Sequence, residues 1–339
     1  MDFRQLLSDG ALKREFFERV SEVAASCDRT DGLEGLDGGI SPGTLEAAAA
    51  SMAEGRWNSS DPGLEAIILR FLRPVYLVQG GSIRPPADNS PNSRAIAGLL
   101  QSARAGLSRV VPSTGRIELR NHRWNWVGTG WMVAPRTVVT NRHVAEEFAR
   151  PAGHGFAFRK SGKGRRVAAY LDWWQEYRQP DESRFRVEEV SWIEPEDGPD
   201  VALLRIADRG EDGEPPPAVV SLMADEEVSR LGVGSWVGVI GYPAYDSRND
   251  HDDQQRIFDG IYNCKRLSPG QVTAFVGDAE LQHDATTLGG SSGSVVVDLA
   301  SGKAVGLHFG GLEGDRNYAV LAPQLIGILR AHASASRTT

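Results

Sequence analysis

The sequence predicts a mainly β structure preceded by a helical N-terminal region. In the first hundred residues, apolar side chains recur at helical spacing, whereas after about Val110 short β-type runs alternate with turns. Glycine makes up 38 of the 339 residues, about 11%, against an average of roughly 7% in proteins. Frequent short strands joined by glycine-rich turns are typical of an all-β sandwich or barrel.

The N-terminal region contains several segments with helical periodicity. Their apolar spacing and capping residues predict helices over residues 8–26, 45–53, 64–71 and 95–107. The apolar run 75–79 predicts one strand, and the glycine, proline, asparagine and serine residues of 80–93 indicate a loop or linker. We therefore expect residues 1–109 to form a helical extension with one strand near 75–79.

The rest of the chain is a series of short β-type runs that ends in a helix. The turn Ala134-Pro135-Arg136 joins two of the runs into a hairpin. The runs cover residues 116–119, 126–133, 137–140, 166–170, 201–206, 235–240, 271–276, 294–298 and 304–309. A closing helix is predicted over residues 323–332.

Charge and cysteine content exclude several classes of function. The 37 Lys+Arg and 45 Asp+Glu residues give a formal net charge of −8, so we expect no nucleic-acid partner. Cys27 and Cys264 cannot build a disulfide framework or a cysteine-based zinc site, and two reduced thiols are a plainer interpretation than one long-range bridge. The N-terminus lacks the apolar run of a secretory signal, and no segment approaches the roughly 20 apolar residues of a membrane span. These features predict a cytoplasmic protein without a membrane partner.

Three polar residues lie at the ends of β-type runs. His143 follows the hairpin in Thr-Asn-Arg-His-Val, Asp200 precedes Val-Ala-Leu-Leu, and Ser292 lies in Gly-Gly-Ser-Ser-Gly before a valine run. A Ser-His-Asp triad needs a hydroxyl nucleophile, an imidazole that takes its proton, and a carboxylate that fixes the imidazole tautomer. Glycines around the serine allow backbone N–H groups to form an oxyanion hole. Each motif alone also fits a structural role, but their combination predicts a hydrolytic site.

This combination resembles the trypsin/chymotrypsin-like serine peptidases, and most of all the bacterial branch with HtrA-type proteases and glutamyl endopeptidases. The resemblance covers about residues 115–328. It implies two six-stranded antiparallel β-barrels with the site in the cleft between them. The expected protease domain spans 110–339 and consists of barrel one at about 110–208, barrel two at about 230–322, and the closing helix.

The resemblance also implies a role for each residue of the motifs. His143 would be the general base, Asp200 its orienting carboxylate and Ser292 the nucleophile. The backbone N–H groups of Gly290 and Ser292 would form the oxyanion hole. Ser291 stands where the family commonly has Asp or Asn, a mild departure because the chemistry does not need that side chain. The expected mechanism uses no cofactor and no metal, and the acidic segment 249–253 is interpreted as a solvated loop.

In this family, the residues six and five positions before the nucleophile line the primary pocket. Thr286 and Thr287 occupy these positions, and the opposite wall is the strand that holds His308, Phe309 and Gly310. A Thr hydroxyl and an imidazole resemble the glutamyl endopeptidase arrangement and can donate hydrogen bonds to a carboxylate. The resemblance therefore implies cleavage after Glu or Asp. In the alternative interpretation, His308 only packs beneath the pocket as a strand residue.

The same residues also fit other interpretations. Gly289 to Gly293 also matches the nucleophile elbow of α/β-hydrolases, but a strand follows it instead of a helix, so that frame is rejected. A non-catalytic protein-binding module on the same fold remains the alternative to a protease with a protein or peptide substrate. The chain lacks the Ile-Val-Gly-Gly start of many relatives that are activated by cleavage. The N-terminal extension is instead expected to dock on the barrels and to offer a surface for a regulatory partner.

Overall fold

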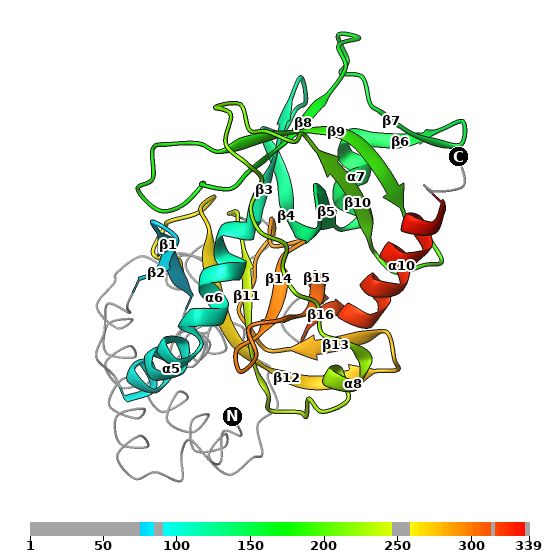
Figure 1. Cartoon of the computed structure of the whole chain (residues 1–339). Coiled ribbons are helices and arrows are strands. Elements are labelled where there is room, and N and C mark those ends of the chain that lie inside the picture. Colours follow the sequence, from blue (N-terminus) through cyan, green and yellow to red (C-terminus); the bar gives the residue numbers. More distant parts are fainter. Residues whose placement is uncertain (1–74, 85–90, 246–257, 313–315, 336–339) are drawn as a thin grey trace, which may run out of the picture.

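The computed structural model describes residues 75–84, 91–245, 258–312 and 316–335 (Figure 1). The helices predicted before residue 75, together with Cys27 and the acidic segment 249–253, lie outside these residues. The described chain forms two β-barrels, one above the other in Figure 1, with helices at their margins.

Barrel one is a closed sheet of six antiparallel strands in the order β10-β5-β4-β3-β8-β9. The side chains that alternate inward, among them Ile117, Leu171 and Phe185, form its apolar core. The strands are β3 (Thr114–Arg120), β4 (Trp126–Ala134), β5 (Thr137–Thr140), β8 (Ala168–Asp172), β9 (Arg184–Ile193) and β10 (Ala202–Ile206).

Barrel two contains six antiparallel strands in the order β11-β14-β15-β16-β13-β12, and pairing of β11 with β12 closes it. Its core includes Val239, Val296 and Leu281. The strands are β11 (Trp236–Gly241), β12 (Arg266–Val276), β13 (Glu280–His283), β14 (Val295–Asp298), β15 (Ala304–Leu312) and β16 (Arg316–Leu321).

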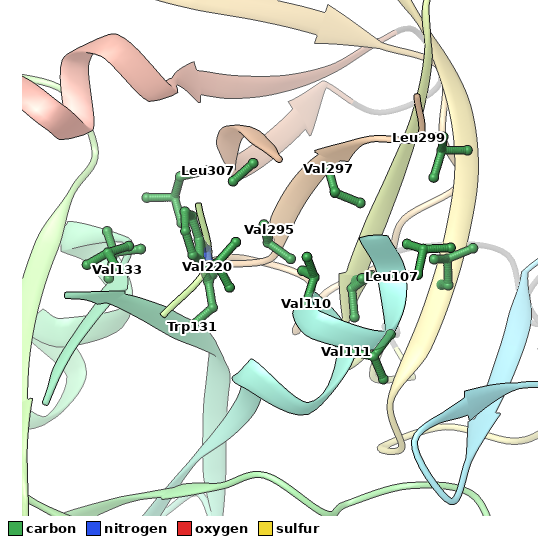
Figure 2. Packing of buried hydrophobic residues seen from close by; sticks show 14 of the residues in the cluster. Leu107, Val110, Val111, Trp131, Val133, Val220, Val295, Val297, Leu299 and Leu307 are labelled. Carbon is green, nitrogen blue, oxygen red and sulfur yellow. The ribbon is translucent and has the colours of Figure 1, made fainter. Parts of the chain in front are cut away.

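An apolar cluster joins the barrels to each other (Figure 2). Trp131 of barrel one packs in the same buried cluster as Val295 and Val297 of barrel two, and Leu107 and Val110 add side chains from a preceding helix. Because this surface is removed from water only when the barrels meet, its burial favours one relative placement of the two barrels.

The segments before barrel one lie against barrel two. β1 (Tyr76–Gln79) pairs antiparallel with β12, with Tyr76 opposite Leu267, and forms a hairpin with β2 (Ser82–Ile83). Two helices follow, α5 (Pro91–Ser102) and α6 (Arg104–Val110), before the short 3-10 helix η1 (Val111–Ser113).

The remaining elements are short, apart from the last helix. α10 (Ala322–Ala335) closes the chain and reaches barrel one, where the ring of His332 lies 4.3 Å from that of Trp192. The others are α7 (Arg142–Phe148), β6 (Ala149–Ala152), β7 (Gly155–Phe158) and α8 (Asp225–Val228).

The fold class predicted from the sequence is confirmed, because the described residues form two closed six-stranded antiparallel barrels. The predicted strand at 75–79 is β1, and the predicted helix at 95–107 is divided into α5 and α6 at Ala103. Among the barrel strands, β9, β13 and β16 were missed by the sequence pattern, as were the short strands β2, β6 and β7 outside the barrels. In β9 the cause is visible, since its exposed positions carry charged side chains that dilute the apolar signal.

Candidate active site

His143 and Asp200 meet at one end of barrel one. β5 ends at Thr140, and Asn141 then precedes α7, so His143 lies in the first turn of that helix. The His143 Nδ1 atom lies 2.6 Å from Asp200 Oδ2, and the His143 backbone N–H donates to Asp200 Oδ1 at 3.1 Å. The Asn141 side-chain amide donates to the Asp200 carbonyl at 2.9 Å. Asp200 is therefore bonded to both the ring and the backbone of His143.

The two side chains differ in their access to solvent. The Asp200 side chain is 15% exposed, whereas that of His143 is 49% exposed. An ionised carboxylate only accepts hydrogen bonds, so a short contact to it places the imidazole proton on Nδ1. The second ring nitrogen is then left as an acceptor on the open side. This tautomer is the one that can take a proton from a hydroxyl.

Ser292 comes from barrel two and lies against barrel one. The Ser292 carbonyl accepts a hydrogen bond from the Thr129 backbone N–H at 2.9 Å. The next residue, Gly293, has φ of +86°, and a Cβ there would stand 2.7 Å from Thr140 Oγ1 and closer still to the Thr129 carbonyl. Only glycine fits this approach. The turn therefore lies beside the end of β5, three residues before His143.

The neighbourhood of Gly290 is equally tight. Its φ is +83°, and a Cβ would stand 2.5 Å from the Trp126 ring and 2.6 Å from the Tyr242 carbonyl. The Gly290 carbonyl accepts from Thr129 Oγ1 at 3.2 Å. Within the described residues, the backbone N–H groups of Gly290 and Ser292 have no acceptor.

The hydroxyl of Ser292 forms no hydrogen bond with any described residue, including His143. Among the described residues, the hydrogen bond between Asp200 and His143 is therefore formed, whereas no hydrogen bond joins His143 to Ser292. Nucleophile-to-base hydrogen bonds are often long in unliganded sites and shorten when substrate binds.

Thr287 is linked to a residue that the motifs did not indicate. Its hydroxyl lies 2.6 Å from Asn317 Oδ1, while Asn317 Nδ2 donates to the Ala285 carbonyl at 2.8 Å. The second bond fixes the orientation of the amide, so the Thr287 hydroxyl donates its proton to Asn317. Thr286, the neighbouring residue, is buried.

His308 is buried beside a second histidine. Its ring lies 5.4 Å from that of His283, measured between centroids. Burial is the main reason that the pKa of His308 lies well below its usual value, and the nearby His283 and His143 lower it further. A hydrogen bond with the Tyr318 backbone acts in the opposite direction. The His308 carbonyl accepts the Gly293 backbone N–H at 2.9 Å, and the His308 N–H donates to the Ser294 carbonyl at 2.9 Å, so His308 lies beside the turn that holds Ser292.

The other predicted wall residues lie further out. The Phe309 ring is partly buried and lies 6.1 Å from the ring of Tyr318. Gly310 faces open space, because a Cβ there would meet no atom within 4 Å.

Among the described residues, no group of three or more His, Cys, Asp or Glu side chains could hold a metal ion. No helix in the described ranges is long and apolar enough to cross a membrane.

Asn317 and His283 are the residues of this neighbourhood that sequence reasoning missed. Asn317 lies on β16, which the apolar pattern did not predict, and in register it stands opposite Gly311 of β15 and His283 of β13. The signal that could have found it is the strand itself. A run that follows the predicted strand 304–309 closely along the chain is expected to pair with it in the same sheet.

Two comparisons relate this chain to known proteins. The family model of the trypsin-like peptidase domain matches residues 128–307. A probable serine protease of Lysobacter enzymogenes is 31% identical over 283 residues, which cover 76% of this chain and 72% of the relative.

Two solved structures share parts of the fold at low identity. A serine endoprotease from Yersinia pestis has a TM-score of 0.45 and 15% identity, covering 68% of this chain and 66% of that one, slightly less than two thirds of its length. The inactive form of a serine-to-alanine mutant from Mycobacterium tuberculosis H37Rv has a TM-score of 0.42 and 20% identity, covering 74% of this chain and 97% of that one.

Proposed function

Because the chain belongs to the trypsin-like serine peptidase family, we propose that it is an endopeptidase in which Ser292, His143 and Asp200 hydrolyse peptide bonds. The observation that carries this proposal is the 2.6 Å contact between His143 Nδ1 and Asp200 Oδ2, next to the glycine-rich turn that holds Ser292. That contact sets the tautomer needed for a general base.

In the proposed mechanism, the Ser292 hydroxyl attacks the carbonyl carbon of the scissile bond and its proton passes to His143. The carbonyl oxygen becomes negatively charged and accepts hydrogen bonds from the N–H groups of Gly290 and Ser292, both of which lack an acceptor in the described chain. His143 then donates its proton to the leaving amine. Water, deprotonated by the same imidazole, hydrolyses the acyl-enzyme ester.

The choice of Ser292 over its neighbour rests on burial. Ser291 is 4% exposed, and its hydroxyl lies 3.5 Å from the Leu288 backbone N–H. Ser292 is more exposed, and its hydroxyl has no partner among the described residues. A nucleophile must reach a substrate from solvent, which favours Ser292.

The test is covalent labelling by a fluorophosphonate, followed by intact mass. We expect one phosphonyl adduct on the wild type, none on Ser292→Ala, and an adduct on the control Ser291→Ala. Loss of a triad serine lowers turnover by a factor on the order of a million, so peptide hydrolysis by Ser292→Ala should fall to background. A reversed result for the two serines would refute the assignment. Absence of labelling in both, with retained peptide binding, would support the non-catalytic binding module.

We also propose a preference for Glu or Asp before the scissile bond. Its support is the resemblance of a threonine before the nucleophile turn and His308 on β15 to the glutamyl endopeptidase pattern, together with the lack of a carboxylate at Thr286. The Thr287 hydroxyl has to leave Asn317 to donate to a substrate carboxylate. Cleavage maps of a proteome digest test the preference, and maps dominated by Lys, Arg or large apolar residues would exclude it.

We also propose how the chain divides into domains and where in the cell it acts. Residues 1–109 would form an extension that receives a regulatory partner, and 110–339 the protease domain. Pairing of β1 with β12 supports docking of the extension on barrel two. The buried Cys264 thiol forms no disulfide with another described residue, and a reduced thiol would fit the proposed cytoplasmic location. Intact mass of the labelled enzyme tests docking: an active species that starts at Val110 would show that the extension is not required.

A further inference from the structure

Lys265, immediately before β12, is a buried ammonium group that the proposed mechanism does not use. Its side chain is fully buried, and Nζ donates to the Val111 carbonyl at 3.0 Å, to the Trp173 carbonyl at 2.7 Å and to Glu176 Oε1 at 3.2 Å. An ammonium group has three protons, and all three are used here. The partners come from η1 and from the loop after β8, so Lys265 joins barrel two to two other segments.

Glu176 extends this link to the N-terminal hairpin. Its second oxygen accepts the backbone N–H of Gly81 at 2.7 Å, in the turn between β1 and β2. The Val78 N–H donates to the Lys265 carbonyl at 3.1 Å, and the Tyr177 N–H donates to the Val78 carbonyl at 2.9 Å. The hairpin is therefore hydrogen-bonded to both members of the ion pair and to the residue after Glu176.

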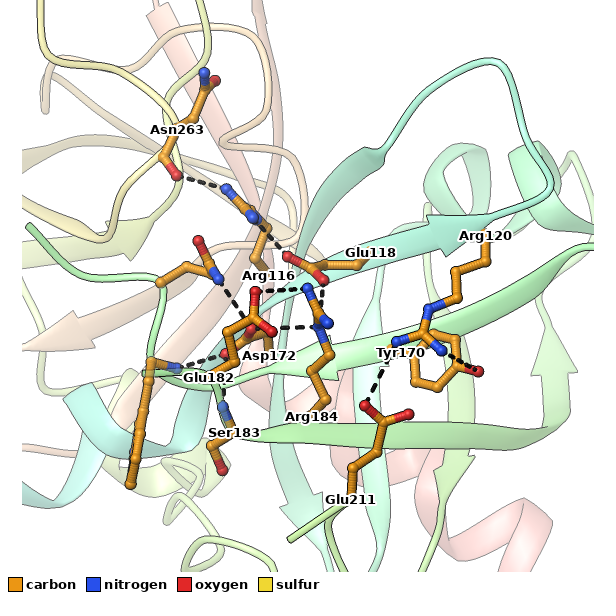
Figure 3. Close-up of polar contacts among 12 residues, drawn as sticks. Arg116, Glu118, Arg120, Tyr170, Asp172, Glu182, Ser183, Arg184, Glu211 and Asn263 are labelled. Carbon is orange, nitrogen blue, oxygen red and sulfur yellow. Dashed lines mark hydrogen bonds and ion pairs between the residues drawn. The ribbon is translucent and has the colours of Figure 1, made fainter. Parts of the chain in front are cut away.

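The loop that carries Trp173 and Glu176 is itself held in place (Figure 3). The fully buried Asp172 carboxylate accepts from the Trp174 and Ser183 backbone N–H groups at 2.9 and 3.1 Å, at both ends of the loop. Arg116 lies beside it and donates to the Asn263 carbonyl of barrel two at 2.7 Å. Glu176 is thus presented to Lys265 by a fixed loop.

The charges in this pair are costly to bury. Desolvation lowers the pKa of Lys265, and the neighbouring Glu176 opposes the shift. Two apolar side chains of similar volume often give equal or greater stability than a buried ion pair. The pair is therefore weak evidence for added stability, and its contacts with three segments of the chain are the feature to explain.

Tyr242 connects Lys265 to Gly290, the glycine proposed to bind the oxyanion. Strands β11 and β12 pair with Gly241 opposite Arg266, which places Tyr242 beside Lys265, and Nζ lies 6.0 Å from the centre of the Tyr242 ring. The Tyr242 hydroxyl donates to the Thr114 carbonyl at 3.3 Å. At the other end of the same residue, the Tyr242 carbonyl stands against Gly290. Two residues later, the Ala244 N–H donates to the Gly289 carbonyl at 2.6 Å.

We propose that Lys265 is a positioning residue: with Glu176 it fastens the β1–β2 hairpin to the junction of the barrels and, through Tyr242, holds the Gly289–Gly290 backbone in place. The inference rests on the proposed function, in which Gly290 stabilises the oxyanion. If the proposal is correct, the β1–β2 hairpin contributes to catalysis by positioning Gly290.

The test compares Lys265→Met, Glu176→Gln and the control Lys303→Met, which breaks the partly exposed Lys303–Glu227 pair elsewhere on barrel two. We expect Lys265→Met to lower kcat and the fluorophosphonate labelling rate by about tenfold, with KM changed less than about twofold, because the oxyanion contacts act in the transition state. Glu176→Gln, which keeps the shape of the side chain, should give a smaller loss in the same direction. The control should leave both rates unchanged.

Amide hydrogen exchange supplies a readout that needs no activity. Exchange in a peptide spanning 286–294 should accelerate in Lys265→Met and in Glu176→Gln, but not in Lys303→Met. Unchanged labelling and exchange in folded Lys265→Met, even with a lowered melting temperature, would reduce the pair to a structural role and overturn the proposal. If Lys265→Met does not fold, the same readouts on Glu176→Gln decide. A wild type that never reacts with fluorophosphonate contradicts the proposed function, whereas the exchange comparison still tests the positioning.

Discussion

At the scale of single residues, the short contact between His143 and Asp200 leads to a prediction about tautomers. In Asp200→Asn the amide can donate to Nδ1, which favours the wrong imidazole tautomer while the geometry is kept. We expect kcat to fall by a factor on the order of ten thousand. Steady-state kinetics measure the loss, and an unchanged melting temperature would show that the fold is retained. A loss of less than about tenfold would contradict the role assigned to Asp200.

If Thr287 binds an acidic substrate side chain as proposed, Asn317 would compete with that substrate for the Thr287 proton. In Asn317→Val the Thr287 hydroxyl is released and can donate to a substrate carboxylate, so we expect the ratio of kcat/KM for Glu over Gln substrates to rise by roughly tenfold. Peptides that differ only in this residue give the measurement.

Asn317→Asp serves as the matched variant in the same assay. It keeps the acceptor but adds a negative charge, and should lower the ratio of Glu over Gln cleavage. The effect of Asn317→Val should disappear when Thr287→Val is combined with it. An unchanged ratio in both Asn317 variants would show that Asn317 does not affect substrate specificity.

Sequence motifs indicate candidate site residues, but they do not indicate which polar residues are buried. His143, Asp200, Ser292 and Gly290 could be proposed from the sequence as site residues, because each lies in a short motif of neighbouring residues along the chain. Lys265 could not, since a lysine within Asn-Cys-Lys-Arg-Leu gives no sign of complete burial. Its partners Val111, Trp173 and Glu176 are distant in sequence, and only the closed barrels bring them together.

At the scale of elements, the junction of α6 with barrel two depends on two glycines. A Cβ on Gly106 would stand 2.6 Å from the Cα of Gly302, which has φ of +70° in the turn between β14 and β15. The obstacle is backbone and not a movable side chain. We therefore expect Gly106→Ala to lower the free energy of unfolding by about 1–3 kcal/mol, because the helix has to move away from the barrel.

Gly98 of α5 provides the matched control for this prediction. A Cβ there would meet no atom within 4 Å. Gly98→Ala should raise the free energy of unfolding by about 0.5–1 kcal/mol, since alanine is the better helix former. Urea denaturation of both variants gives the comparison, and equal stabilities would show that α6 does not depend on this close approach.

Elements with a strong apolar pattern were easier to predict than those that depend on their neighbours. β14, which is buried at every position, could be predicted from its valines alone. β13 and β16 are short or mixed in polarity, and they become strands because β12 and β15 offer unpaired edges. Asn317 belongs to such a strand, so the element and the site residue were missed for the same reason.

At the scale of the whole molecule, the buried histidines predict loss of stability in mild acid. Burial lowers the pKa of His283 to about 3, and the pKa of His308 is also well below its usual value. The folded state therefore binds fewer protons than the unfolded chain below about pH 6.5, the ordinary histidine pKa. The stability they contribute is present above that pH and is lost as the pH falls, by roughly 1 kcal/mol per unit for each histidine.

Urea denaturation from about pH 8 to about pH 5 measures this dependence. We expect His283→Leu to have a shallower slope than the wild type, because one buried imidazole no longer has to be protonated on unfolding. His154 is exposed and supplies the control, so His154→Gln should keep the wild-type slope. Equal slopes in all three proteins would show that His283 does not govern the acid response.

The placement of His143 and Asp200 on one barrel and Ser292 on the other has a practical consequence. Each barrel has its own buried core, and the chain between them passes through exposed residues such as Asp212 and Gly213. A chain split at this point yields two fragments that are each inert but share a complementary apolar face around Trp131 and Val295. If each half is fused to a different protein, hydrolysis should return only when the two fusion partners bind each other. The divided site would then report that the two partners are in contact.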